Sequence, residues 1–323
     1  MRLCYSYVTC KLKSYTKMKI SNSKIIMITS TLILILSSFS TKNIAKKGEF
    51  QDGITLNWKV SQNDTIVYRT VMKQLGESEF EMNFNQVFSS LHKIVPDSIS
   101  RKLDSIPESD NLFDNDFFKK IKELYQNYNL TTYLTRSKVF EGIIDVEMIR
   151  KLNKTNDSLN EKEGFNEMLS GTQLKGSIYR NGSIHSFWLN NSQKNLVALF
   201  FQLPKKKVKI GDIWSLQDLN YIQYGNIFHC EKADKTNEVK LTGINKTEND
   251  VIAVMEYNIH EYVSGKIDFM GSLSPSQMEM SFKGKSEFSV NKGRWISYVG
   301  FLTVKSNGIM NSNSSQKLAL IEE

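Results

Sequence analysis

A helical pattern and a strand pattern meet in the segment SQKNLVALFFQLPKKKVKIGDIW, Ser192–Trp214. Its first half is an apolar run that begins after the capping residue Ser192 and stops at Pro204. This pattern favours a short helix. After the proline, Val208 and Ile210 alternate with lysines, which is typical of a strand with one face in water. The segment therefore predicts a short helix that leads into a lysine-bearing strand.

The lysines after Pro204 also spell a basic motif of the kind that directs proteins to the nucleus or to nucleic acid. The N-terminus argues against that function. Its basic residues precede the apolar run Ile25–Leu36, and small residues that end at Ser40 follow it, which together are typical of a secretory signal peptide. We therefore predict a signal peptide over residues 1–40, with Met18 favoured over Met1 as the start and cleavage after Ser40.

The predicted signal peptide carries much of the positive charge. Its basic residues are Arg2, Lys11, Lys13, Lys17, Lys19 and Lys24. It has no acidic residue, so removing these six charges lowers the net charge from +8 to about +2. A chain of this size with so small a net charge has no electrostatic preference for polyanions, and we predict no nucleic-acid partner.

The apolar run is shorter than the about 20 residues that a helix needs to cross a bilayer. We therefore expect no transmembrane span in the mature chain and an exported protein of the periplasm or cell envelope. A signal that is kept as an anchor is the alternative. Cys4 and Cys10 leave with the signal, so Cys230 has no partner for an internal disulfide, and we interpret it as a small buried apolar residue.

Strand patterns dominate the mature chain. Ile54–Val60 and Thr65–Met72 flank a polar turn and predict a hairpin, and Asn181-Gly182 suits the tight turn of a second one. Later in the chain, long alternating segments separated by short turns predict an antiparallel meander. These segments are Asn237–Ile244, Asp250–Val263, Met278–Val290 and Arg294–Ser306. The polar run Asn311–Gln316 is interpreted as the start of a flexible tail.

A helical block interrupts these strands over residues 77–128. Apolar residues recur at helical spacing in Phe84–Val95 and again in Phe117–Tyr128. The sequence therefore predicts an α+β protein with a single domain, 41–323. We expect a large curved antiparallel sheet, a half-barrel-like meander, with the helical block packed on one side as an insertion or a cover.

The aromatic residues of this block are the candidate ligand-binding residues. They are Phe84, Phe88, Phe117, Phe118, Tyr125 and Tyr128. They lie on two apolar stripes that could line a cavity between helices and sheet. They fit an ordinary hydrophobic core equally well, and their spacing does not separate the two interpretations.

Motifs for catalysis or metal binding are missing from the sequence. The four histidines are scattered over different predicted elements, whereas a zinc site needs three protein ligands gathered together. No serine sits in a nucleophile elbow, and no carboxylate pair has a distinctive setting. We predict no metal, no cofactor and no catalytic residue. This favours a binding protein, and an enzyme built from scattered residues is the less favoured alternative.

About half of the mature chain, roughly Gly171–Ser306, resembles a group of exported bacterial proteins of unknown function. The shared pattern is L-P…V-K-x-G-D-x-W, here Leu203, Pro204, Val208, Gly211, Asp212 and Trp214. The resemblance implies an envelope location and, more loosely, a curved sheet like that of bacterial lipoprotein carriers, and it brings no catalytic residue. From the residues themselves we expect Gly211 and Asp212 to form a tight turn that returns Trp214 to the sheet, which is a structural role.

Two functions fit these expectations. The first is a non-enzymatic envelope protein that binds a lipid or another apolar ligand in a cup between sheet and helices. The second is a structural or scaffold module of the envelope that contacts protein partners through a sheet edge. A cavity of several hundred Å³ between sheet and helices favours the first, and a filled core favours the second.

Overall fold

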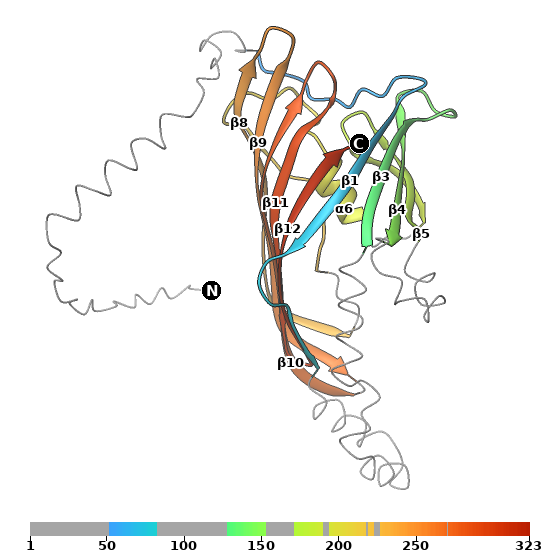
Figure 1. Ribbon diagram of the computed structural model, residues 1–323. Helices are drawn as coiled ribbons and strands as arrows, with labels where there is room; N and C mark the ends of the chain where they lie inside the picture. Colours follow the sequence, from blue (N-terminus) through green and yellow to red (C-terminus); the bar gives the residue numbers. More distant parts are fainter. Residues whose placement is uncertain are drawn as a thin grey trace, which may run out of the picture. The chain divides into compact units, whose positions relative to one another are not determined.

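Antiparallel strands make up almost all the regular structure in the part of the chain that the structure describes (Figure 1). The computed structural model describes residues 52–82, 128–152, 171–189, 194–217, 219–222, 227–269 and 271–323, which belong to one compact unit, Asn43–Glu323. The predicted signal peptide, residues 1–40, lies outside these ranges.

A single sheet contains all the described strands. They are β1 (Thr65–Gln74), β2 (Glu79–Met82), β3 (Tyr128–Arg136), β4 (Ile143–Leu152), β5 (Gly171–Tyr179), β6 (Ile184–Leu189), β7 (Ile213–Trp214), β8 (Phe228–Lys246), β9 (Val251–Phe269), β10 (Ser272–Ser289), β11 (Arg294–Asn307) and β12 (Met310–Glu322). Their order is β6-β5-β4-β3-β1-β12-β11-β10-β9-β8-β7, and β2 pairs with β12 off this path. The C-terminal strand therefore joins the early strands to the late ones.

The meander predicted for the last third of the chain is confirmed. Strands β8 to β12 pair in chain order, because each has an alternating pattern and a short turn joins it to the next. The predicted tail Asn311–Gln316 was wrong, because it is the first half of β12 and pairs with β11 on one side and with β1 and β2 on the other. Pairing on both sides orders a polar stretch whose composition alone favours a loop.

The predicted N-terminal hairpin is also wrong. Strand β1 pairs with β12 and β3, not with Ile54–Val60. That segment is extended and crosses between other elements: its first residue forms a bridge with Val208, and the Trp58 N–H donates to the Arg180 carbonyl at 2.7 Å. Its alternating apolar residues are buried as the pattern indicates, but the pattern does not choose their neighbours.

The α+β class is corrected to a protein made almost entirely of strands. Within the described ranges only α6 (Lys194–Phe201) is an α-helix. Both ends of the predicted helical block are strands, since Glu79–Met82 pairs with β12 and Tyr128 begins β3. Residues 83–127 of the block lie outside the described residues. The helix prediction was wrong at these ends because the backbone there pairs with neighbouring strands. The spacing of apolar residues along the sequence does not reveal such pairing.

The helix predicted after Ser192 is confirmed as α6, and its C-terminal end is buried against the sheet. The last four carbonyls of a helix have no partner within it. Here the Gln202 N–H donates to Ala198, and three aromatic side chains donate to the next three carbonyls. These bonds join Tyr298 Oη to Leu199 (2.9 Å), Trp295 Nε1 to Phe200 (2.8 Å) and Trp58 Nε1 to Phe201 (2.7 Å). Burial raises the pKa of Tyr298, so its hydroxyl stays a donor.

The same rings form the centre of the hydrophobic core. Trp58 meets four other aromatic rings edge to face, with ring centroids 5.4–6.1 Å apart. These rings belong to Tyr68, Phe201, Phe288 and Trp295, all of them buried. Edge-to-face contacts place the positive edge of one ring on the negative face of another. The space between α6 and the sheet is therefore filled by side chains.

The predicted hairpin at Asn181-Gly182 is confirmed, and its turn packs on the end of α6. Gly182 has a φ of +74° and lies so close to the helix that a Cβ atom there would be 1.7 Å from the Phe201 carbonyl oxygen. The Leu203 N–H donates to the Asn181 carbonyl at 2.8 Å. The helix end is thus bound by the β5–β6 turn as well as by β11.

We predict that Gly182→Ala lowers the free energy of unfolding by about 2–4 kcal/mol, because it combines a left-handed φ with a clash against the helix. Gly76→Ala is the matched control, since Gly76 has a φ of +73° with no atom within 4 Å of the added Cβ. The control should lose only about 1–2 kcal/mol. Urea unfolding measures both, and equal losses would contradict the close approach.

Candidate functional site

Backbone hydrogen bonds build the turn of the G-D-x-W element. Gly211 has a φ of +98°, in the left-handed region that glycine adopts readily. Its N–H donates to the Leu241 carbonyl (2.7 Å), and the Leu241 N–H donates to the Asp212 carbonyl (3.0 Å). The Asp212 carboxylate also accepts the Lys209 N–H (2.8 Å). The turn is attached to β8, and it places half-buried Trp214 against the core.

The lysines after Pro204 are exposed, but they do not belong to a regular strand. Only Val208 forms a bridge, and Ile210, expected on the same buried face, is 60% exposed. The turn that follows ends the alternation before a strand develops. Lys205–Lys207 instead line the rim of a cavity of about 360 Å³ that Pro204 and Val208 also line.

The predicted aromatic ligand-binding residues do not form a site among the described residues. Phe84, Phe88, Phe117, Phe118 and Tyr125 lie outside the described ranges. Tyr128 is the first residue of β3 and is paired with Leu152, so its assignment to a helix was wrong. A role of these residues in ligand binding stays a prediction.

Cys230 is exposed, which corrects its assignment to the core. It lies in the exposed stretch His229–Lys235 of β8, at a register shift between Cys230 and Lys232. The shift interrupts the alternation that would otherwise turn every second side chain toward the core.

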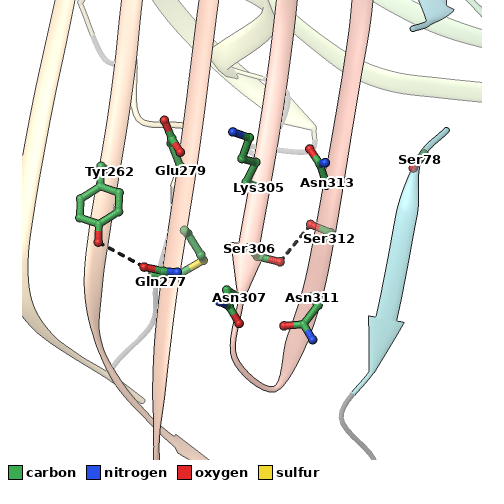
Figure 2. Close-up of a pocket in the computed structure, with 11 residues that line it drawn as sticks. Ser78, Tyr262, Gln277, Glu279, Lys305, Ser306, Asn307, Asn311, Ser312 and Asn313 are labelled. Atoms are coloured by element: carbon green, nitrogen blue, oxygen red, sulfur yellow. Dashed lines mark hydrogen bonds between the residues drawn. The ribbon is translucent and has the colours of Figure 1, made fainter. Parts of the chain in front are cut away.

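A polar cavity of about 870 Å³ lies at one end of β9–β12 (Figure 2). Amide, hydroxyl and charged side chains predominate among its described lining residues, which also include Met278. Tyr262 and Glu279 of the lining alternate along their strands with Glu261 and Met280, which are buried on the face toward α6. We call that buried side the core face and the opposite side the outer face. Most of the described lining residues alternate to the outer face, whereas Met278, Ser306 and Ser312 alternate to the core face. We name the cavity the outer-face pocket after the larger group.

Four lining residues form a row across the sheet. Tyr262 of β9, Glu279 of β10, Lys305 of β11 and Asn313 of β12 are successive cross-strand partners. Figure 2 shows them side by side on neighbouring strands. Neighbouring strands are about 4.8 Å apart, so the row presents one side chain at each such step.

Short polar contacts orient one half of this row. The Tyr262 hydroxyl donates to Gln277 Oε1 (3.4 Å), and Lys232 Nζ lies 5.8 Å from the centroid of the Tyr262 ring. His260 Nε2 lies 3.2 Å from Glu279 Oε1. The ring and the carboxylate are therefore held in place by neighbours on the same sheet.

The other half of the pocket has uncommitted polar groups. The side-chain amides of Asn307 and Asn313 make no hydrogen bond to another described residue, and Lys305 has no ion-pair partner there. Each amide offers two donors and a carbonyl acceptor. The pocket can therefore form several directed hydrogen bonds with a ligand.

The described part of the chain contains neither a cluster of metal ligands nor a membrane-spanning helix. No group of three or more His, Cys, Asp or Glu side chains there could hold a metal ion. No helix in those ranges combines the length and apolar character needed to cross a bilayer.

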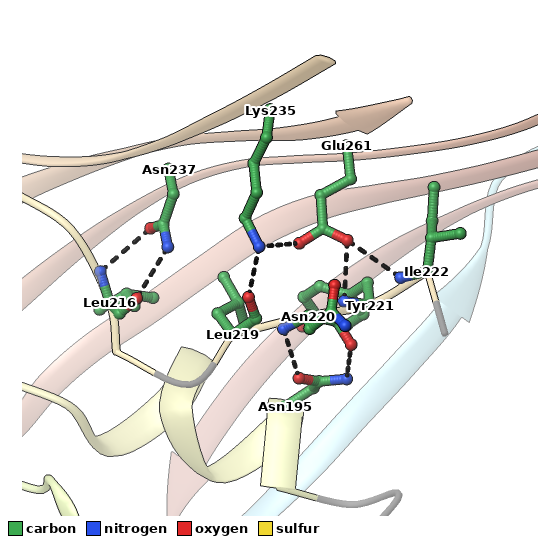
Figure 3. Close-up of polar contacts among 9 residues, drawn as sticks. All are labelled: Asn195, Leu216, Leu219, Asn220, Tyr221, Ile222, Lys235, Asn237 and Glu261. Atoms are coloured by element: carbon green, nitrogen blue, oxygen red, sulfur yellow. Dashed lines mark hydrogen bonds and ion pairs between the residues drawn. The ribbon is translucent and has the colours of Figure 1, made fainter. Parts of the chain in front are cut away.

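A segment without a strand partner crosses the core face near β8 and β9. Its residues 215–217 and 219–222 bury Leu216, Leu219 and Ile222. Amide side chains satisfy its backbone in place of a neighbouring strand. Each accepts the N–H of one residue and donates to the carbonyl of the same residue, as Figure 3 shows for Asn237 and Asn195. The pairs are Asn237 with Leu216, Gln202 with Gln217, and Asn195 with Asn220.

Glu261 is the buried carboxylate that holds the end of this segment. Its Oε2 accepts the N–H groups of Tyr221 and Ile222, both at 2.9 Å. Its Oε1 lies 3.0 Å from Lys235 Nζ, which also donates to the Leu219 carbonyl (2.6 Å). Burial, and then the Glu261 charge, raise the pKa of Tyr221, so that phenol stays neutral. Oε2 is occupied by two backbone N–H groups and Oε1 by the ion pair with Lys235, so we assign Glu261 a structural role.

No protein-family model, curated protein or solved structure matches this chain. The resemblance carried by Leu203–Trp214 therefore stays an expectation. Function has to be argued from the geometry of the chain itself.

Sequence reasoning missed both the outer-face pocket and the buried carboxylate. One sequence signal could have indicated the pocket: polar residues alternate with apolar ones along β9–β12. This alternation places Tyr262, Glu279, Lys305 and Asn313 on one face. Bringing them into one row also requires the strand register, which alternation alone does not supply.

We predict that Glu261→Leu lowers the free energy of unfolding by about 3 kcal/mol or more, because two buried N–H groups and Lys235 lose their partner. Glu261→Gln keeps an acceptor and should lose less. Glu256→Leu, at an exposed position of the same strand, should change stability by about 0.5 kcal/mol or less. Chemical unfolding measures all three, and a neutral Glu261→Leu would contradict the assignment.

Proposed function

We propose that this chain is an exported, non-enzymatic protein of the cell envelope that acts as a binding module. In this proposal the outer-face pocket contacts the partner. The observation that carries it is a polar cavity of about 870 Å³, within the range of known ligand sites, whose lining includes free amide groups. The pattern of residues 1–40 supports export.

The position of the pocket on paired strands supports a binding role. Strands β10, β11 and β12 each pair with a neighbour on both sides along the pocket. Side chains on such strands keep their spacing better than side chains on loops, so less order has to be imposed when a ligand binds. The pocket therefore suits recognition of a surface with a fixed spacing.

The filled core favours a scaffold-like module over a carrier with an internal cup. Aromatic side chains and α6 occupy the core face at its centre. An acyl chain there would have to displace rings that donate hydrogen bonds to the helix end. That displacement would leave buried carbonyls without donors, which is costly.

A second candidate function, binding of a lipid or another apolar ligand, rests on a different part of the core face. Val304 is 40% exposed although its cross-strand partner Met280 is buried. Met72 is 46% exposed although its partner Leu318 is buried. Apolar side chains thus continue beyond the filled core, and an acyl chain laid on them would gain about 0.8 kcal/mol for each methylene removed from water.

For the first proposal we predict that the exported protein begins at Thr41 and is retained in the envelope fraction through the outer-face pocket. The double variant Tyr262→Ala/Asn313→Ala should pass largely into the soluble exported fraction, because it lacks an anchoring ring and a free amide. Asn258→Ala, an exposed asparagine of β9 outside the pocket lining, is the control and should be retained. Fractionation with N-terminal sequencing tests this, and unchanged retention of the double variant would contradict it.

For the apolar ligand we predict micromolar, saturable binding of a fluorescent fatty acid that Val304→Asp weakens at least about tenfold, because the aspartate would be desolvated by the acyl chain. Thr303→Asp is the matched control, since the adjacent side chain lies on the outer face with Ser315. Fluorescence titration measures both. Equal binding by the two variants, or none by the unmodified protein, would exclude this function.

A further inference from the structure

We propose that the outer-face pocket binds a neutral, hydroxyl-rich chain, a glycan, laid across strands β9–β12. This inference rests on the proposed function, because it names the partner class of the same pocket. Its basis is the combination of balanced charge, free amide groups, one oriented aromatic ring and a regular row of side chains.

The charge in the row argues against a strongly ionic ligand. Glu279 and Lys305 are direct cross-strand partners with opposite charges, so their fields largely cancel. Lys232 adds one positive charge beside Tyr262 at the β9 end. His260 lies against Glu279 on the side away from Lys305. A polyanion or a polycation would gain attraction from one of these groups and repulsion from the other, whereas a neutral ligand is not penalised.

The described lining has few apolar side chains, which argues against a ligand or a protein interface held chiefly by apolar contacts. Among the described lining residues, Met278 is the one without a hydroxyl, amide or charged group. Protein interfaces draw most of their binding energy from buried aromatic and apolar anchors in the middle of the contact. Among the described lining residues only Tyr262 could be such an anchor, so the chemistry of this lining suits a ligand that binds chiefly through hydrogen bonds.

The free amides match the hydroxyl groups of a sugar. Asn313 and Asn307 make no side-chain hydrogen bond to another described residue, and both are exposed. An amide offers donors and an acceptor side by side, and neighbouring hydroxyls do the same, so one amide can exchange two hydrogen bonds with a hydroxyl pair. Neutral partners of this kind bind without the desolvation cost of a charge.

Tyr262 provides the contact for the C–H face of a sugar ring. Contacts with Gln277 and Lys232 fix the orientation of its side chain before a ligand arrives. The face of an aromatic ring is negative and apolar, and it attracts the weakly positive C–H groups of a pyranose. The ring stands at the β9 end of the row, with Asn313 at the β12 end.

The spacing of the row favours an extended chain over a single sugar. Side chains repeat at each strand, about 4.8 Å apart, which is comparable to the width of one pyranose ring. A linear glycan that runs perpendicular to the strands would place successive sugars over successive residues of the row. Affinity should therefore rise with chain length until the oligosaccharide spans from Tyr262 to Asn313.

The test uses the purified mature chain, residues 41–323, with chitohexaose and cellohexaose as probes and their monosaccharides as references. Titration calorimetry should detect saturable binding of at least one hexamer, at least about tenfold tighter than its monosaccharide. Asn313→Ala should weaken that binding about fivefold to tenfold, by the loss of its hydrogen bonds. Asn258→Ala, an asparagine on the same face outside the pocket lining, should leave it within about twofold.

Three results would overturn the glycan assignment: no binding of either hexamer, equal affinity for hexamer and monosaccharide, or equal effects of the two asparagine variants. Variants are compared only where circular dichroism and melting match the unmodified protein, and Asn313→Gln should recover part of the binding. The outcome is separable from the proposed function. If pocket variants lose envelope retention while no glycan binds, the pocket contacts its partner through other chemistry and only the ligand class is wrong.

Discussion

The buried carbonyls at the end of α6 impose a constraint that couples this helix to the sheet. A helix of eight residues is too short to be stable alone, and its last carbonyls would be left unpaired in an apolar core. Tyr298, Trp295 and Trp58 each donate to one of them. Because the three donors come from distant parts of the chain, the helix forms only when the core forms, and helix and sheet stabilise each other.

This constraint also decides where function can lie. The centre of the core face is occupied by rings that both fill space and donate hydrogen bonds, so it offers little room for a ligand. Side chains on the outer face neither fill the core nor donate to the helix end. Residues in its polar rows can therefore be exchanged without affecting the core. The row from Tyr262 to Asn313, which carries the proposed contacts, lies on this outer side of the sheet.

Polar side chains stabilise the fold on the core face, whereas our proposal assigns those of the outer face to recognition. The two groups differ in their hydrogen bonds. Asn195, Asn237 and Gln202 are saturated by the backbone that they hold. Asn307 and Asn313 belong to the same chemical class but make no such bonds within the described residues. A saturated amide stabilises the fold, whereas an uncommitted one is available to a ligand.

Local features could be predicted from the sequence. They are the short helix before Pro204, the Asn181-Gly182 hairpin and the C-terminal meander, each of which depends on neighbouring residues. The other features depend on the tertiary structure. It made the polar run Asn311–Gln316 a central strand, separated Ile54–Val60 from β1 and assigned Tyr128 to a strand, because pairing between distant segments outweighs local pattern. It also formed the row from Tyr262 to Asn313, since register is set by how strands align and not by the residues within any one of them.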